Sequence, residues 1–290
     1  MTKPLLSPMN DYVFKRLFTE YLSLLRHFLQ TVVELPADEY EHMLIVDPAF
    51  RAHKEHDKLP ILDVKMQTTS GISIDLEAQQ RFQRFFDKRL AYYTGRMYVD
   101  RLQSGDPYDK LTRAISIVVA DFPLIPNDAC HNCFRLYDPR TRTAYPECLE
   151  IHTLEIPKRQ MGDTSPLSQW LHFFAAHTEE EFMSLARINP VMERAWGVIK
   201  ELSADEEARL QAEAQEKFRR DMDAMYKTGH FDGRAEGFAD GEAKGFADGE
   251  ARRSRDIAAN LLQLGLPLEQ IATCTGLTVD EMRELQLQQQ

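Results

Sequence analysis

The stretch ILDVKMQTTSGISIDLEAQ, residues 61–79, decides the fold. Its even-numbered positions on either side of the central TTSG are apolar, whereas its odd-numbered positions after Ile61 are polar. A period of two is typical of β-strands with one face in the core. Thr, Ser and Gly at residues 68–71 favour a turn. The stretch therefore predicts an antiparallel hairpin with one buried face.

The register of this hairpin places two acidic residues opposite each other. A turn centred near Ser70 pairs Asp63 with Glu77, and Lys65 with Asp75. Cross-strand neighbours have Cβ atoms about 5 Å apart, and carboxylates this close repel unless a cation lies between them. A divalent cation such as Mg²⁺ would neutralise both and could activate water for phosphodiester cleavage. The alternative is a solvated hairpin face on which Asp63 pairs with a nearby lysine, and a one-residue shift of the turn would break the pairing.

Further strands and helices surround the hairpin in the sequence. The continuous apolar run AISIVVADF, residues 114–122, indicates a buried central strand. Apolar spacing predicts helices over residues 12–35, 81–102 and 166–202, and short strands over residues 42–46, 134–137 and 151–156. This order of elements indicates an α/β or α+β fold.

The C-terminal part of the chain has a different composition. Residues 201–251 contain 14 acidic and 7 basic residues, as in a solvated acidic helix. Glycines recur every four residues from Gly229 to Gly249, and this series includes the eight-residue repeat GFADGEAK–GFADGEAR at residues 237–252. Because each glycine costs a helix about 1 kcal/mol relative to alanine, two interpretations stay open. The segment is either a frayed linker or a helix that becomes ordered against a second copy.

The last residues predict a small module of three helices. Gly265 and Gly276 are natural helix stops, and Pro267 and Thr278 mark the following helix starts. This pattern is of helix-turn-helix type, but few bases accompany it, so we expect helix association rather than DNA reading. The predicted organisation is a domain over residues 1–200, an acidic helix with a Gly-rich repeat linker over 201–252, and an association module over 253–290.

Composition excludes several classes of protein. An apolar content of 43% in 290 residues supports a sizeable core. The net charge of -11 excludes a globally basic nucleic-acid coat. No run of about 20 apolar residues is present, and no secretory signal is visible at the N-terminus, so we expect no membrane partner. Four cysteines are too few for a disulfide scaffold, which predicts a reduced, cytoplasmic protein.

One predicted helix is basic. Residues 81–101 contain six bases and two acids. Arg84, Lys88 and Arg89 follow helical spacing, and Tyr92 or Tyr93 could lie against a sugar or base. These cations suit phosphate contacts, although an ordinary solvated helix would look the same.

Two possible metal motifs are weak. The run HKEHD contains His53, His56 and Asp57, but its polarity favours a solvated loop. The run CHNC, from Cys130 to Cys133, is a single CxxC. Zinc usually needs further ligands, and Cys148 and His152 stand at a poor spacing, so we do not expect a structural zinc from this motif.

Several segments together resemble a known family. They are NDYVFKRLF (10–18), ILDVKMQT (61–68), IDLEAQ (74–79), RFFDKRLAYYTGRMY (84–98) and the tail at 260–282. Their order resembles the recombination-promoting nucleases, a group of PD-(D/E)XK nuclease family transposases. The resemblance implies an α/β fold with a PD-(D/E)XK restriction-endonuclease-like core, in which helices flank a mixed central sheet, and a helical C-terminal extension.

The resemblance also implies a Mg²⁺-dependent DNA endonuclease, with Mn²⁺ possible in place of Mg²⁺. Asp63 and Glu77 would hold the metal, and Asp11 matches an early acidic position that could add a ligand. Gln79 stands where the signature has lysine. Because glutamine carries no positive charge, activity is then weak or Lys65 supplies the charge from the same face. Related members also carry glutamine there.

Three functions therefore compete. The first is a metal-dependent DNA endonuclease that forms a homo-oligomer, most simply a dimer, through its C-terminal tail. The second is a catalytically inactive DNA-binding or scaffolding protein that keeps the nuclease fold. The third is a tail-driven assembly protein with an unrelated N-terminal domain.

Overall fold

The computed structural model describes residues 4–47, 63–146 and 148–288. The chain divides into two compact units, Met1–Lys217 and Phe218–Gln290, which are described here separately. His53, His56 and Asp57 of the HKEHD run lie outside the described residues.

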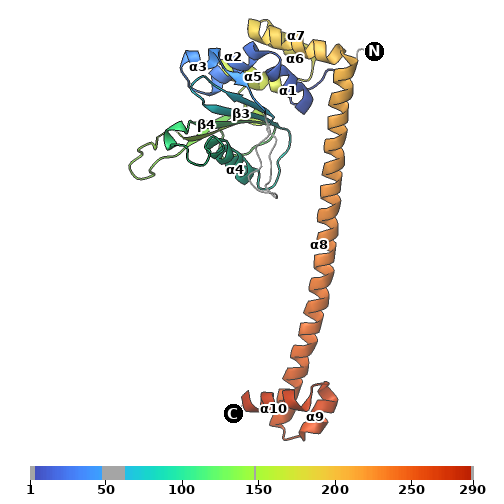
Figure 1. Ribbon diagram of the computed structural model, residues 1–290. Coiled ribbons are helices and arrows are strands. Elements are labelled where there is room, and N and C mark those ends of the chain that lie inside the picture. The colour runs from blue at the N-terminus through green and yellow to red at the C-terminus, as the bar shows by residue number, and fades with distance from the viewer. Residues whose placement is uncertain (1–3, 48–62, 147, 289–290) are drawn as a thin grey trace. The chain divides into compact units, whose positions relative to one another are not determined.

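Six strands form one mixed sheet in the first unit (Figure 1). They are β1 (Leu44–Ile45), β2 (Val64–Gln67), β3 (Ser73–Gln79), β4 (Ala114–Ala120), β5 (His131–Arg135) and β6 (Leu149–Glu155). Their spatial order is β1-β2-β3-β4-β6-β5. β3, β4 and β6 run parallel, and the other pairs are antiparallel. The predicted mixed sheet is confirmed, and the carboxyl ends of its parallel strands share one edge.

The predicted hairpin register is confirmed. Val64 pairs with Leu76, and Lys65 pairs with Asp75. The prediction of a single buried face is wrong, because Asp75 and Glu77 are also buried. Helix α4 (Phe86–Val99) covers the odd-numbered face, and it packs against β3, β4 and β6.

The other face of the sheet carries the remaining helices of the first unit (Figure 1). They are α1 (Asp11–Thr19), α2 (Leu22–Val32), α3 (Ala37–Glu41), α5 (Pro166–Ala175), α6 (Glu179–Ala186) and α7 (Pro190–Ala204). Two short 3₁₀ turns, Tyr108–Lys110 and Ile156–Lys158, complete the connections. Phe18, Phe28, Trp170 and Phe174 form an aromatic cluster at the centre of this layer, with ring centroids 5.3 to 6.3 Å apart.

Several predicted elements have different boundaries in the structure. The helix expected over residues 166–202 is three helices, α5, α6 and α7. The helix expected over residues 12–35 is two helices, because Glu20 ends α1 and Tyr21 precedes α2. The helix expected from residue 81 begins at Phe86, after Phe85 adopts a left-handed conformation with φ 63°. β5 covers residues 131–135 rather than 134–137; it is a half-exposed edge strand, so its apolar pattern is weak.

The second unit is helical. Its helices are α8 (Glu206–Gln263), which begins in the first unit, α9 (Leu268–Thr275) and α10 (Val279–Gln288). The first turns of α8 belong to the core of the first unit, because Ala208 and Ala212 are buried there and the Asn10 side chain donates a hydrogen bond to the Ala212 carbonyl at 3.2 Å. The first unit therefore extends to Lys217.

The glycine repeat lies inside α8. The segment is helical, as the second interpretation requires, and the second copy of that interpretation stays a prediction. Phe238 and Phe246 of the repeat are 74% and 72% exposed, so nothing within the described residues covers them.

The predicted three-helix module is confirmed at the end of α8, α9 and α10. Gly265 and Gly276 have φ values of 75° and 71°, the left-handed conformation that ends a helix. Thr278 Oγ1 accepts from the Glu281 backbone N–H at 3.3 Å, and the Glu281 carboxylate accepts from the Thr278 N–H. Ile271 is at the centre of the module's small core.

Within the described residues, no helix combines the length and the hydropathy that a membrane crossing requires. All four cysteines, which are Cys130, Cys133, Cys148 and Cys274, are free thiols.

Candidate active site

β2 and β3 bring Asp63 and Glu77 to the same end of the sheet. Val64 pairs with Leu76, and continuing this register by one residue places Asp63 opposite Glu77. Asp63 Oδ2 accepts a hydrogen bond from the Ala78 backbone N–H at 3.1 Å, which holds its carboxylate against the end of β3. The structure thus brings together the two carboxyl groups that the sequence pairs.

Both carboxyl groups are largely removed from water. Glu77 is 4% exposed, and the side chain of Asp63 is 17% exposed. Burial, with a contribution from the Asp63 charge, raises the pKa of Glu77 to about 7. Burial also raises the pKa of Asp63 to about 6, against the opposing effect of Lys15. Each group therefore resists ionisation unless a positive charge joins it.

Helix α1 adds an acid and a lysine to this end of the sheet. Lys15 Nζ lies 2.9 Å from Asp11 Oδ1 and 3.2 Å from Asp63 Oδ1, so one ammonium group forms ion pairs with two carboxylates. The side chain of Asn10 caps the helix. The side chain of Gln80, directly after β3, donates to the carbonyl that precedes Asn10. These contacts fix Asp11 and Lys15 beside the strand ends.

Gln79 and Arg89 form a polar chain that leads to Glu77. Gln79 Nε2 donates to Glu77 Oε2 at 3.4 Å, and Arg89 Nη2 donates to Gln79 Oε1 at 3.5 Å. The Arg89 guanidinium also lies over the Phe86 ring at 4.9 Å. Its charge lowers the pKa of Glu77. Arg89 thus provides a cation next to the position where the signature has lysine.

Lys65 has a different environment. It lies across from Asp75 in the register. Burial lowers its pKa, while Asp100 and Asp75 raise it. The cations that act on the pKa of Glu77 are Arg89 and Lys15. The structure therefore offers these two as sources of positive charge at Glu77, in addition to the Lys65 that the sequence suggests.

Asp75 is a further buried acid of the same strand face. Its side chain is fully buried, and neither carboxylate oxygen has a hydrogen-bond partner among the residues that the structure describes. Burial, reinforced by the charges of Glu77 and Asp63, raises its pKa well above the ordinary value. Three carboxyl groups therefore crowd one part of the sheet.

The predicted DNA-binding residues surround the start of α4. Arg84 precedes the helix rather than lying in it. Its guanidinium lies 4.8 Å from the Phe85 ring centroid, and Lys88 Nζ lies 5.3 Å from the same ring. Phe85 is 55% exposed, because Phe86 takes the buried position. Tyr93 is half-buried, with Arg89 5.9 Å from its ring centroid.

The donor set fits a hard divalent cation. Asp63, Glu77 and Asp11 offer carboxylate oxygens, the ligands that Mg²⁺ and Mn²⁺ prefer. The raised pKa values of Asp63 and Glu77 show that two buried carboxyl groups lack a full complement of positive charge. A bound cation would supply that charge.

The sequence pattern did not identify Lys15 and Asp75 as residues of the acidic site. Lys15 lies four residues after Asp11, a spacing that places both on one face of a helix, and this was an available signal. Asp75 could not be identified as buried, because an alternating strand gives no sign of a second covering helix.

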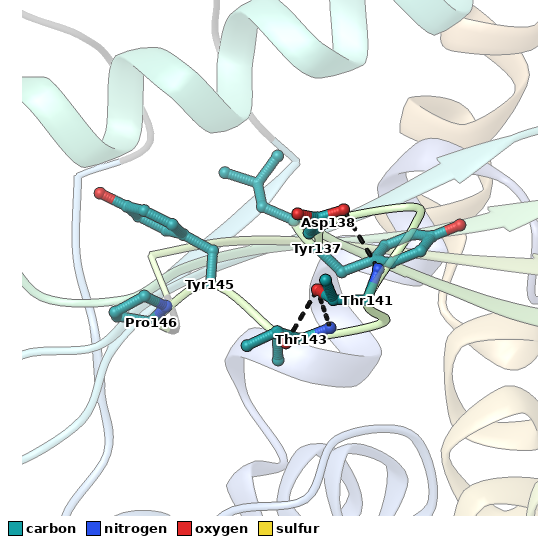
Figure 2. Close-up of a pocket in the computed structure, with 8 residues that line it drawn as sticks. Tyr137, Asp138, Thr141, Thr143, Tyr145 and Pro146 are labelled. Carbon is teal, nitrogen blue, oxygen red and sulfur yellow. Dashed lines mark hydrogen bonds between the residues drawn. The ribbon is translucent and has the colours of Figure 1, made fainter.

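A cavity of about 700 Å³ lies elsewhere, at the turn after β5 (Figure 2). Its lining includes Tyr137, Tyr145 and Pro146. Figure 2 shows Asp138 accepting from the Thr141 backbone within this turn, at 3.3 Å. The turn leaves the sheet where β6 begins, at the opposite end from the carboxyl ends of the parallel strands, so the cavity is separate from the acidic site.

Comparison with known proteins identifies the family. A family model described as PD-(D/E)XK nuclease family transposase matches residues 8–229, which include the whole sheet and its acidic site. Neither the curated proteins nor the solved structures give a match. The family match, which covers well over half of the chain, agrees with the mixed sheet and its flanking helices: the chain belongs to the PD-(D/E)XK nuclease family transposases.

Proposed function

We propose that the protein is a Mg²⁺-dependent DNA endonuclease that hydrolyses phosphodiester bonds. The observation that carries this proposal is the meeting of Asp63 and Glu77 at one end of the sheet, both buried and both with raised pKa values. The family is one of nucleases. Recombination, the movement of mobile elements and phage-related processes are the biological settings that this activity suits.

Each residue of the acidic site has a role in this proposal. Asp63 and Glu77 hold the cation, and Asp11 holds it directly or orients a ligand. The bound cation would lower the pKa of a water molecule and offset charge on the phosphate. Lys15 positions Asp63 and Asp11 through its two ion pairs.

Gln79 and Arg89 together take the place of the signature lysine. Gln79 links Glu77 to Arg89 by two hydrogen bonds, so the positive charge reaches the site from α4 rather than from the strand. A guanidinium next to the scissile phosphate stabilises the negative charge that develops in the transition state. Lys65 remains the second candidate for this charge.

The DNA surface of the proposal is the start of α4. Arg84 and Lys88 flank the exposed ring of Phe85, so two cations and an aromatic face are presented together. This combination suits phosphate contacts beside a sugar or base. Arg89 connects this surface to Glu77 through Gln79, and Tyr93 lies one turn further along α4.

Relaxation of supercoiled plasmid tests the activity. We expect full-length protein to nick the plasmid in Mg²⁺ and to lose this activity in EDTA. Exchange of Arg89 for alanine should reduce the rate much more than exchange of Arg84, since only Arg89 contacts Gln79. DNA binding without any nicking, in Mg²⁺ or Mn²⁺, would support the inactive scaffolding protein instead.

The C-terminal tail supports assembly of two copies. Phe218, Met222 and Met225 are exposed on α8 at spacings of four and three residues, as in the apolar seam of a coiled coil. The acidity of this segment disfavours DNA as its partner, because phosphates would repel it. We therefore include a homodimer through the tail in the proposal.

Truncation after Lys217 tests the assembly. This boundary keeps Ala208 and Ala212 in the core of the first unit. We expect the dimer to become a monomer and double-strand cutting to give way to nicking, while chemistry at Asp63 and Glu77 survives. Light scattering that gives the full-length chain and the truncated chain the same oligomeric state would show that the tail does not assemble the enzyme.

A further inference from the structure

A second cluster of possible metal ligands lies on the other face of the sheet. In the β5–β6 pair, Cys133 is directly opposite His152, and Arg135 is opposite Glu150. In the β4–β6 pair, Glu150 lies beside Ile115, which belongs to the main core. The side chains of Asp75 and Glu77, by contrast, lie on the face that α4 covers. The two clusters are therefore separated by the sheet.

The ligand atoms of this cluster converge. The sulfur of Cys133, one nitrogen of His152 and one oxygen of Glu150 all lie within 4.8 Å of one another. Cys133 Sγ is 3.8 Å from His152 Nε2, and Glu150 Oε1 is 2.5 Å from the same nitrogen. We propose that Cys133, Glu150 and His152 form a binding site for a thiophilic divalent cation, with Zn²⁺ as the preferred ion.

The spacing of sulfur and nitrogen suits this ion. With Zn–S near 2.3 Å and Zn–N near 2.0–2.1 Å, tetrahedral ligands lie roughly 3.6 Å apart, close to the observed 3.8 Å. The shorter approach of Glu150 Oε1 to His152 Nε2 is that of a hydrogen bond. Binding would replace the proton between these two atoms by the cation, and the carboxylate would move back by about 1 Å to give a tetrahedral ligand separation.

Neighbouring groups hold the ligands in suitable orientations. His131 Nε2 lies 2.8 Å from His152 Nδ1, so it can accept the proton of that nitrogen and leave Nε2 free for a metal. Arg135 Nε donates to Glu150 Oε2 at 2.8 Å, and Arg113 donates to the same oxygen. Arg135 Nη2 also donates to Glu150 Oε1, at 3.2 Å, so the two arginines fix the orientation of the whole carboxylate, with Oε1 directed at His152. Such outer partners are typical of metal ligands.

Burial and donor type favour zinc over magnesium. Glu150 and His152 are 1% and 2% exposed, whereas Cys133 is exposed and gives a cation access from solvent. Thiolate and imidazole are ligands of zinc, whereas magnesium takes oxygen. Three protein ligands leave a fourth position for water. The ligands come from positions 133, 150 and 152, so the CxxC spacing of the sequence does not define the site.

Metal binding by the full-length protein tests this proposal independently of nuclease activity. Protein stripped with EDTA is dialysed against Zn²⁺, and bound metal is measured by elemental analysis; Co²⁺ is used in parallel for its thiolate charge-transfer absorption. We expect one Zn²⁺ per chain and a thiolate–cobalt band. Cys133→Ser should abolish the band and weaken Zn²⁺ binding by at least about tenfold, and its exposed position makes it tolerable to the fold.

Two control variants make the result decisive. Cys274→Ser changes an exposed cysteine of the second unit, and Asp63→Asn changes the acidic site on the other face. Both should keep the metal and the cobalt band. Unchanged zinc affinity in Cys133→Ser, or loss of zinc in Asp63→Asn, would overturn the site, as would the absence of stoichiometric zinc in the unmodified protein.

Discussion

Glu77 and Glu150 are two glutamates of one sheet, on opposite faces, and almost equally buried, at 4% and 1% exposure. Their ionisation differs sharply. Burial raises the pKa of Glu77 to about 7. The pKa of Glu150 is held well below its usual value, because hydrogen bonds from His152, Arg135 and Arg113 outweigh the effect of burial.

The pKa values differ because different groups supply positive charge to the two carboxylates. Glu150 receives it from two arginines within the fold, so its ionised form is satisfied without any metal. Glu77 has acids as close neighbours and only an indirect link to Arg89. A buried carboxylate left short of charge is typical of a functional site rather than of a structural ion pair. The fold itself thus keeps Glu150 ionised, which the proposed Zn²⁺ site requires of a ligand, whereas Glu77 depends on a bound cation for its ionised form.

The largest expected effect is on cleavage. Asp63→Asn keeps the size of the side chain but removes a charged ligand, so we expect the rate of plasmid cleavage in Mg²⁺ to fall by about a thousandfold, because a bound metal contributes several kcal/mol to transition-state stabilisation. Glu77→Gln should have a similar effect. Initial rates at saturating Mg²⁺ measure it.

Asp109→Asn is the matched control for these variants. Asp109 is exposed in the 3₁₀ turn Tyr108–Lys110, away from the acidic site, and its exchange should leave the cleavage rate within about twofold of the unmodified enzyme, since a surface substitution changes little. Cleavage by Asp63→Asn at the rate of this control would remove Asp63 from the site.

The second effect concerns stability on the opposite face. Arg113→Met removes one partner of a buried ion pair and leaves Glu150 with less positive charge, so we expect the free energy of unfolding to fall by about 3 kcal/mol. Urea denaturation measures it. Lys110→Met breaks the exposed pair with Asp106 and should cost less than about 1 kcal/mol. Equal losses in the two variants would show that Glu150 does not depend on Arg113.

The sequence predicted the pairing across the hairpin because the pattern of residues 61–79 fixes both the strand period and the turn. It also predicted β4, since a continuous apolar run belongs to a strand that is covered on both faces. It did not predict that α4 covers β3 and buries Asp75, because no local pattern records which helix packs on which face. The start of α4 at Phe86 was missed for a related reason: Phe82 and Phe85 continue the apolar spacing, but tertiary contacts bury only Phe86.

The same limit applies to the candidate sites. Asp63, Glu77 and Gln79 stand out because they are close in one hairpin. Lys15 and Arg89 reach this hairpin from two helices, and their contacts depend on how those helices pack. Of the Cys133–Glu150–His152 cluster, the sequence offered Cys133 and His152 as possible zinc ligands and set them aside for their poor spacing. It did not identify Glu150, because the three residues meet only through the pairing of β5 with β6. Residues that share a hairpin with a short turn are readable from sequence, whereas residues brought together by helix packing, or by strands that a longer loop connects, are not.

The third effect is on pH dependence. In the metal-free protein Asp63 and Glu77 bind protons up to pH values of about 6 and 7, so Mg²⁺ must displace protons below that range. We expect the affinity for Mg²⁺ to fall by about tenfold per pH unit below pH 6, as expected for the release of at least one proton. Calorimetric titration between pH 5.5 and 8 measures it. A Mg²⁺ affinity that stays constant over this range would contradict the raised pKa values.

The metal-free protein should show the matching trend in stability. Because the pKa values of Asp63 and Glu77 are higher in the folded chain than in the unfolded chain, their contribution to stability is present below the ordinary carboxyl pKa and is lost as pH rises through 6 to 7. Thermal unfolding in EDTA at several pH values would detect this loss, and Mg²⁺ should restore stability most strongly at the alkaline end.

The smallest expected effect comes from Asp75, which contrasts most directly with Glu150. Within the described part of the chain, both carboxylate oxygens of Asp75 are buried without a hydrogen-bond partner. The charges of Glu77 and Asp63 add to the effect of burial in raising its pKa. Above the ordinary carboxyl pKa, the folded protein must either keep the proton on Asp75 or bury a poorly compensated charge. Asp75→Asn removes that cost at alkaline pH, and we expect Tm in EDTA at pH 8 to rise by about 2–4 °C, which corresponds to about 1 kcal/mol in a domain of this size. At a pH below the ordinary carboxyl pKa, where Asp75 is protonated in both states, the variant should give no gain. A loss of stability at pH 8 would show that Lys65 already compensates the negative charge of Asp75. Asp75 and Glu150 would then both be buried carboxylates with a compensating cation.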